Sequence, residues 1–221
     1  MPRTDKAEMS LTPRAKEFRE TLKAEASGYG VPLTTEALNA LSQYFELVER
    51  WNGRVHLVAP CSPREFATRH VLESLTVLKH LPDGAHVAEV GAGAGLPILP
   101  CLIVRPDFYA ILIEAAQKKA VFLREALSQN GLSARATVIN ERFENVPVPP
   151  VDVVTCRALE RFEEMLPHLL EWAPAPATLL LFGSTRLATK IESLGFNSAA
   201  ELMPRSKSRY LLIVNKAGNR C

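Results

Sequence analysis

Residues 86–97, His-Val-Ala-Glu-Val-Gly-Ala-Gly-Ala-Gly-Leu-Pro, decide the fold. A short apolar run ends at Val90 and leads directly into glycines at positions 91, 93 and 95, before helix-forming sequence. Glycine permits a tight turn and a close approach of the backbone to a ligand, and the first N–H groups of a following helix face that ligand. A strand, a glycine loop and a helix in this order indicate a ligand site in an α/β fold. Plain packing of a strand against a helix is the alternative, because short motifs give frequent false positives.

The spacing of the glycines separates two classes of ligand. A dinucleotide fingerprint reads GxGxxG, but the third glycine here comes one residue earlier, as Gly91-Ala-Gly93-Ala-Gly95. Glu89 precedes the first glycine by two positions. Its carboxylate would repel a pyrophosphate and attract the ammonium group of S-adenosylmethionine. The loop therefore favours S-adenosylmethionine over NAD.

Two acidic segments follow the next apolar runs. Glu114 ends the second run, 23 residues after Gly91. An acid at this edge of a strand is placed to bind the ribose hydroxyls of an adenosine, and an acid that only favours a helix start is the alternative. Glu141-Arg142-Phe143-Glu144 follow the third run, where a loop can hold an adenine against Phe143. A phenylalanine of the core is the alternative for that position.

Short apolar runs outside the glycine loop predict the strands of a sheet. They are Ala85–Val90, Phe108–Ile113, Ala134–Ile139, Val151–Cys156 and Ala177–Phe182, with helices predicted at Gln117–Gln129 and Leu159–Trp172. Apolar runs that alternate with amphipathic helices indicate βαβ units and a parallel sheet covered on both faces. Only Pro204–Arg209 separates the last two runs, Ala199–Met203 and Tyr210–Val214, so these strands should be antiparallel. The expected fold class is α/β: a Rossmann-like, mostly parallel sheet with an antiparallel C-terminal strand, as in class I S-adenosylmethionine-dependent methyltransferases.

The first third of the chain predicts helices and no strand. A frayed basic helix is expected at roughly Pro13–Ala26, and a second helix after Thr34 or Thr35 that ends at Trp51-Asn52-Gly53. Ser62 should cap a third helix that runs to about His80. We therefore expect residues 1–82 to form a helical extension and residues 83–221 to form the cofactor-binding core.

Composition excludes several other classes of protein. The chain has 221 residues, of which 47% are apolar and 23% charged, as in a globular protein with a full core. No apolar run approaches the roughly 20 residues of a membrane helix, and the N-terminus has no apolar signal segment. The four cysteines are scattered, which indicates no metal site and a reducing cytoplasm. A cytoplasmic protein without a membrane partner is expected.

The positive charge is concentrated at the C-terminal end. Five basic and no acidic residues lie in 202–221, which leaves 21 basic against 24 acidic residues in the rest of the chain. A basic end on a slightly acidic body indicates a polyanion such as nucleic acid, and a solvated basic tail is the alternative.

Several segments together resemble the bacterial RsmG (GidB) methyltransferases. The resemblance covers about Leu38 to Lys216 and is most specific in Arg69-His-Val-Leu-Glu-Ser74 before Glu89–Pro97. Other matching segments are Arg50-Trp-Asn52, Ile103-Val-Arg-Pro106, Lys118-Lys119, Phe122-Leu123, Arg142-Phe-Glu144 and Cys156-Arg-Ala158. The family methylates N7 of a guanine in 16S ribosomal RNA, so the resemblance implies that activity, S-adenosylmethionine as cofactor, and ribosomal RNA or the small ribosomal subunit as partner.

The resemblance, together with the loop, also implies site residues. The cofactor-binding candidates are Glu89, Gly91, Gly93, Gly95, Leu96, Glu114, Phe143, Glu144 and Arg157. The RNA-contact candidates are Arg50, Arg69, His70, Lys118, Arg157, Arg205 and Arg209. A packed histidine is the alternative for His70, and a surface ion pair with Glu160 or Glu163 is the alternative for Arg157. No catalytic acid or base is assigned, because guanine N7 carries a free lone pair and no proton.

The chain departs from the family at the substrate side more than at the loop. The family usually has Asn-Leu-Thr at His56-Leu57-Val58, Gly at Ile98, Ser at Cys156 and Lys at Phe182. A methyltransferase for another substrate, or a cofactor-binding protein without activity, therefore remains an alternative. A monomer is expected.

Overall fold

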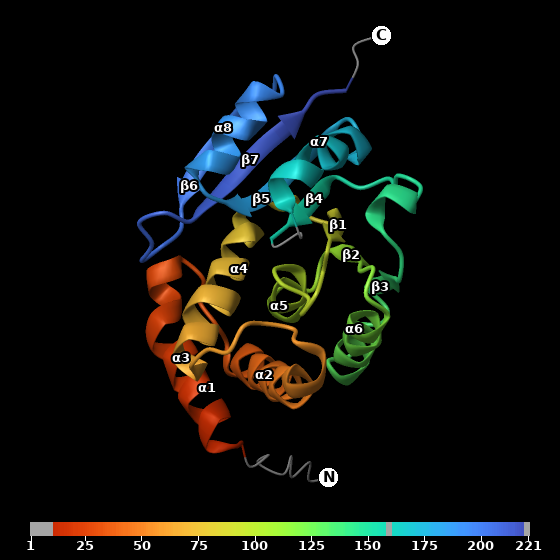
Figure 1. Ribbon diagram of the computed structural model, residues 1–221. Helices are drawn as coiled ribbons and strands as arrows, with labels where there is room; N and C mark the ends of the chain where they lie inside the picture. Colours follow the sequence, from red (N-terminus) through yellow and green to blue (C-terminus); the bar gives the residue numbers. More distant parts are fainter. Residues whose placement is uncertain (1–10, 158–160, 219–221) are drawn as a thin grey trace.

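The computed structural model describes residues 11–157 and 161–218, and within this part it contains a mixed sheet of seven strands in the order β3-β2-β1-β4-β5-β7-β6 (Figure 1). The strands are β1 (His86–Val90), β2 (Tyr109–Ile113), β3 (Ala136–Ile139), β4 (Val153–Cys156), β5 (Ala177–Gly183), β6 (Ser198–Leu202) and β7 (Tyr210–Lys216). The first five strands pair in parallel, and β7 pairs antiparallel with both β5 and β6. The predicted class of fold is confirmed, including the antiparallel C-terminal hairpin.

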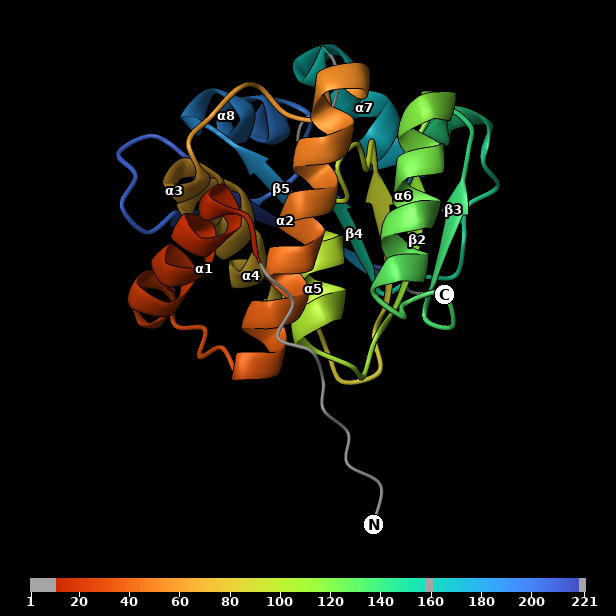
Figure 2. The same ribbon diagram turned by 90° about the horizontal axis from the view of Figure 1, so that it is seen from below.

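Helices cover both faces of the sheet. They are α1 (Pro13–Glu25), α2 (Thr35–Val55), α3 (Pro63–Glu65), α4 (Glu73–Leu75), α5 (Ile98–Val104), α6 (Gln117–Gln129), α7 (Phe162–Trp172) and α8 (Thr185–Ser193). Short 3-10 turns lie at Ala26–Tyr29, Thr76–His80 and Phe143–Asn145, and a π-helical segment at Phe66–Leu72 joins α3 to α4. Neighbours in β1 show the two faces. Val87 belongs to the buried cluster that includes side chains of α1, α2, α4, α5 and α6, and Ala88 belongs to the cluster that includes side chains of α7 and α8. Figures 1 and 2 show the helices on the two sides of the sheet.

The N-terminal helices agree with the sequence pattern, with two corrections. Thr34 caps α2 by accepting the Ala37 N–H, and Ser62 caps α3 by accepting the Glu65 N–H. Helix α2 continues past the expected stop to Val55, and His56 then ends it in the left-handed region. Helix α1 is not frayed, because Phe18 is fully buried and stacks on Phe45 of α2 at 4.5 Å.

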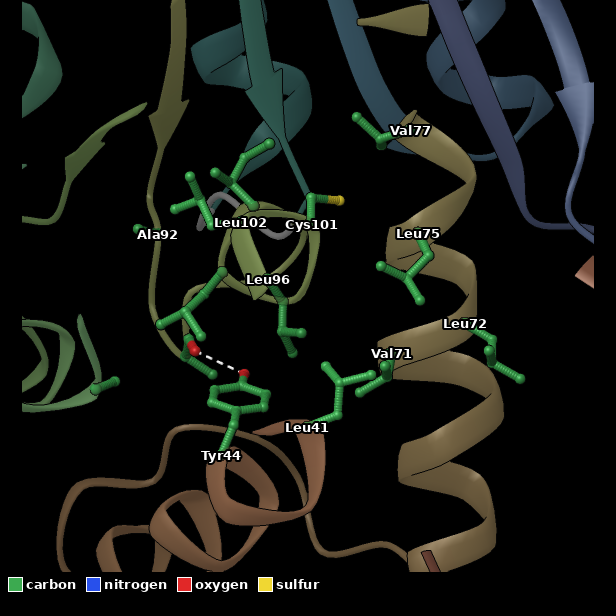
Figure 3. Close-up of a cluster of buried hydrophobic side chains, with 14 of the residues drawn as sticks. Leu41, Tyr44, Val71, Leu72, Leu75, Val77, Ala92, Leu96, Cys101 and Leu102 are labelled. Carbon is green, nitrogen blue, oxygen red and sulfur yellow. Dashed lines mark hydrogen bonds between the residues drawn. The ribbon is translucent and has the colours of Figure 1, made fainter. Parts of the chain in front are cut away.

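One cluster of buried side chains joins the N-terminal helices to the sheet. Figure 3 shows Leu41 and Tyr44 of α2 facing Val71 and the side chains of α5. The Tyr44 hydroxyl donates a hydrogen bond of 2.8 Å to the Ala94 carbonyl within the glycine loop. Helix α2 therefore supports the loop directly. The division at residues 82 and 83 stays a prediction.

Within the described ranges, none of the helices combines the length and apolar character required to span a membrane.

Candidate active site

A cleft of about 630 Å³ lies at the carboxyl ends of the central parallel strands. This edge of an open α/β sheet is where such folds bind ligands. Its walls come from the loops after β1, β2, β3 and β4, from the segment after α2, from the π-helical segment, and from the first turns of α6 and α7. The residues that line it are Leu57, Val58, Ala59, His70, Gly91, Ala92, Gly93, Ala94, Leu96, Ile113, Glu114, Ala115, Ala116, Lys119, Glu141, Arg142, Phe143, Glu144, Arg157, Arg161 and Met165.

The three glycines of the loop have different surroundings. All three have positive φ, at 69° for Gly91, 54° for Gly93 and 81° for Gly95. A Cβ added at Gly93 would meet no atom closer than the Gly91 carbonyl oxygen at 3.7 Å, so this glycine opens onto the cleft. A Cβ added at Gly95 would lie 2.8 Å from Leu99 Cβ, and Gly95 is not part of the cleft wall. Gly95 therefore serves helix packing.

Glu114 connects β2 to the glycine loop. Its Oε2 accepts the Gly93 N–H at 2.8 Å, and its Oε1 accepts the Ala116 N–H at 2.8 Å. Each carboxylate oxygen can accept a second hydrogen bond, and the residue lines the cleft. Glu114 thus fits a group with two hydroxyls and also fixes the loop.

Glu89 lies behind the cleft wall. It is fully buried, its Oε2 accepts the Ile98 N–H at 3.0 Å, and Oε1 has no hydrogen-bond partner among the described residues. Burial raises the pKa of Glu89 to about 8, although the Ile98 bond opposes the shift. A direct ion pair between Glu89 and a cofactor ammonium is not supported, because this carboxyl does not line the cleft.

The segment after β3 forms one end of the cleft. Glu141, Arg142, Phe143 and Glu144 all line it. Phe143 is buried and packs edge-on against Trp172 at 5.7 Å, so it is both a core side chain and part of the wall. Glu144 is exposed at the mouth.

Arg157 follows β4 at the other end of the cleft. Its guanidinium donates to the His70 carbonyl (3.2 Å) and the Ser74 hydroxyl (3.0 Å), and it lies 4.9 Å from the centre of the Phe182 ring. Burial lowers the pKa of Arg157, and the nearby Glu73 carboxylate opposes that shift. The surface pairing considered from the sequence is wrong for Glu163, which binds Arg186 at 2.8 Å, while Glu160 lies outside the described residues.

Part of the cleft wall comes from the N-terminal helices and the segment after α2. The Asn52 side chain holds the segment after α2, donating to the Val58 carbonyl at 3.0 Å and accepting the Val58 N–H at 2.9 Å. His70 lines the cleft and packs against Phe66 at 5.3 Å. Burial lowers the pKa of His70 to about 3, and Arg157 adds to the shift, so this histidine is neutral at physiological pH.

The basic RNA-contact candidates do not form one surface of unpaired charges. Arg69 pairs with Glu65 at 2.5 Å, and Arg50 donates to Gln129 at 3.4 Å. Lys118 is exposed on α6 but outside the cleft wall, where its neighbour Lys119 lies. The hairpin arginines are ion-paired: Arg205 with Glu25 at 2.5 Å and Arg209 with Glu73 at 2.6 Å.

Sequence reasoning missed several residues that shape the site. Tyr44 and Glu73 act through partners far along the chain, at separations that no local pattern reveals. Asn52 acts on Val58, six residues further along, through a turn that the sequence pattern did not identify. Asn52 and Glu73 do lie within segments that resemble the family, which was the one available signal. Lys119, Arg142 and Arg161 also line the cleft.

The strand order, the glycine loop and the cleft together define the class of S-adenosylmethionine-dependent methyltransferases of class I. The chain is similar in structure to a SAM-dependent methyltransferase from Aquifex aeolicus, with a TM-score of 0.55 and 17% identity over 68% of this chain and 92% of that one. It is also similar to the tRNA methyltransferase TrmK of B. subtilis, with a TM-score of 0.52 and 15% identity over 66% of this chain and 65% of that one. At these identities the likeness shows the fold.

The particular family follows from sequence. The model of GidB, rRNA small subunit methyltransferase G, matches residues 37–197, and the chain belongs to this family. Two relatives are ribosomal RNA small subunit methyltransferases G. The Yersinia enterocolitica protein is 32% identical over 86% of this chain and 95% of its own length. The Nitrosomonas eutropha protein is 38% identical over 59% of this chain, and the match spans 62% of that protein, less than two thirds of its length.

Proposed function

We propose that the chain transfers the methyl group of S-adenosylmethionine to N7 of a guanine in the 16S ribosomal RNA of the small subunit. The observation that carries the proposal is the cleft in which the Gly93 backbone and the Glu114 carboxylate share one wall. Membership of the rRNA small subunit methyltransferase G family supports the choice of acceptor.

The residues of the cleft fit S-adenosylmethionine, which supplies a methyl group activated on its sulfonium. Glu114 has spare acceptor capacity for two ribose hydroxyls, and the open face of Gly93 leaves room for a ligand against the backbone. Phe143 and Glu144 follow β3 and would hold the adenine. Gly91 and Leu96 would contact the cofactor from the loop.

We infer the direction of the bound cofactor from the strand order. Neighbouring strands lie about 5 Å apart, and the cleft crosses them in the order β3, β2, β1, β4. With adenosine held after β3 and β2, the amino-acid end points toward β1 and β4. Arg157, which follows β4, lies at that end.

The chemistry requires positioning more than proton transfer. Guanine N7 attacks with an in-plane lone pair, so no side chain has to remove a proton. His70 is neutral beside the cleft and suits a role as wall or hydrogen-bonding group. Leu57, Val58 and Leu96 would exclude water from the reacting atoms.

The RNA would bind around the mouth of this cleft. Lys119 and Arg142 lie in the wall, and Arg50, Arg69 and Lys118 are exposed on neighbouring helices. Phosphate contacts by such side chains make affinity fall with salt. We expect Arg205 and Arg209 of the β6–β7 hairpin to contribute less to RNA binding, since both are ion-paired with carboxylates of this chain. The protein would act as a monomer.

The proposal is tested by methyl transfer from labelled S-adenosylmethionine to purified small-subunit RNA and to small-subunit particles, with large-subunit RNA as control. Label in a small-subunit acceptor alone supports the proposal. Equal label in both RNAs, or label only in protein or small molecules, points to a different substrate on the same fold. Tight cofactor binding without transfer to any acceptor would indicate a binding protein.

A further inference from the structure

Glu73 is a buried carboxylate that lies between two arginines. Its side chain is 1% exposed, Oε1 accepts two hydrogen bonds from Arg209 (3.0 and 2.6 Å), and Oε2 accepts one from Arg157 (3.4 Å). Buried charges persist where they are paired and hydrogen-bonded. The three side chains form one unit with a net charge of +1, and it joins the cleft to the β6–β7 hairpin.

The hydrogen bonds of Arg157 show how it is held at the cleft and which of its donors remain for a ligand. A guanidinium has five N–H groups. The four on the terminal nitrogens donate to protein acceptors, namely the carbonyls of Arg69 and His70, the Ser74 hydroxyl and Glu73. None of these four hydrogen bonds uses the Nε–H group. Arg157 is therefore held rigidly and offers a ligand its charge and one donor, not a bidentate fork.

The local helix geometry explains why Glu73 can reach this position. The Glu73 N–H bonds the Thr68 carbonyl five residues back, which is the π-helical pattern. Arg157 and the Ser74 hydroxyl both donate to the His70 carbonyl at this turn. The same turn places the Glu73 carboxylate beside Arg157.

Phe182 also contacts the guanidinium of Arg157. Its ring is buried and faces the guanidinium at 4.9 Å, a favourable arrangement for a cation over an aromatic face. In this chain the carboxylate and the ring therefore act on the same guanidinium from different elements.

We propose that Glu73 is a positioning residue for methyl transfer: it fixes the charge of Arg157 at the end of the cleft that receives the amino-acid group of the cofactor. This inference rests on the proposed function. Arg209 shares the carboxylate and ties the hairpin to the same point.

The test compares two ligands by calorimetry on the full chain. S-adenosylhomocysteine has an amino-acid group, whereas 5′-methylthioadenosine has the same nucleoside and thioether without it. Glu73→Gln should weaken the binding of S-adenosylhomocysteine about tenfold, the effect of one charge-assisted hydrogen bond, and leave 5′-methylthioadenosine unchanged. Glu25→Gln is a matched control, because Glu25 also holds two arginines, Arg64 and Arg205, away from the cleft. It should change neither affinity.

The outcomes separate a positioning role from a structural one. Equal weakening of both ligands by Glu73→Gln, or no weakening of either, overturns the proposal while leaving the proposed function intact. If Glu73→Gln does not fold, Glu73→Gln/Arg209→Gln removes one charge of each sign and should show the same selective loss. A wild-type chain that binds neither ligand overturns the proposed function and this inference with it.

Discussion

Alanine at Gly93 and alanine at Gly95 should have opposite consequences, although the two glycines lie two residues apart. Both residues have positive φ, which costs an alanine about 1–2 kcal/mol of folding free energy. At Gly93 the new methyl group meets no protein atom within 3.7 Å and enters the cleft. At Gly95 it would lie 2.8 Å from Leu99 Cβ and 3.3 Å from Leu123 Cδ2.

These contacts set the magnitudes. Gly93→Ala should lower the free energy of unfolding by only the backbone cost, about 1–2 kcal/mol. Gly95→Ala should add an overpacking cost of about 1–3 kcal/mol, because Leu99 must move. Cofactor binding should show the reverse order. The methyl group at position 93 intrudes on the ligand and should cost about 1–3 kcal/mol of binding free energy.

The assay is urea unfolding of both variants together with calorimetric titration of S-adenosylhomocysteine at a temperature where both are folded. Equal destabilisation of the two variants would refute the packing argument for Gly95. Normal affinity in folded Gly93→Ala would refute the placement of the cofactor against the loop.

Three further predictions address single side chains. Glu114→Gln should weaken S-adenosylhomocysteine and 5′-methylthioadenosine alike by about 1–3 kcal/mol, because both carry the ribose; an unchanged dissociation constant in calorimetry would make Glu114 a purely structural acid. Tyr44→Phe leaves the buried Ala94 carbonyl without its donor and should lower the free energy of unfolding by about 1–3 kcal/mol, and a loss below about 0.5 kcal/mol in urea titrations would contradict this. The pKa of Glu89 is raised from 4.5 to about 8, so the folded state binds its proton more tightly than the unfolded state and wild-type stability falls as pH rises through this window. Glu89→Gln has no such proton, so its free energy of unfolding relative to wild type should increase between about pH 5 and pH 8. If urea titrations gave the same difference between the two proteins at every pH, burial would not raise the pKa of Glu89.

Much of the fold could be predicted because its signals are local. Helix α6 occupies the predicted range Gln117–Gln129, and the five predicted parallel strands occur in chain order. The short hairpin connection was enough to predict antiparallel strands. Helix α8 was not predicted, since it has only nine residues and buries only Leu187 and Ile191. The π-helical segment was also missed, because its register depends on partners outside the helix.

The site was predictable only in part, for a physical reason. The positions of Gly93 and Glu114 follow from strand ends, and the cleft contains both. The environment of Arg157 does not follow, because its acceptors lie 83 to 88 residues earlier in the chain. The ion pairs of the basic hairpin could not be predicted from the sequence either, since Arg205 and Arg209 pair with carboxylates on the N-terminal helices.

The most direct test of the central claim is to map 7-methylguanosine in small-subunit ribosomal RNA by mass spectrometry, using cells with and without the gene. Cells that lack the gene should lose one 7-methylguanosine. The wild-type gene should restore it, and a gene encoding Gly93→Ala should restore less. An identical set of 7-methylguanosines with and without the gene, or the loss of a methyl group from another atom, would contradict the proposed reaction.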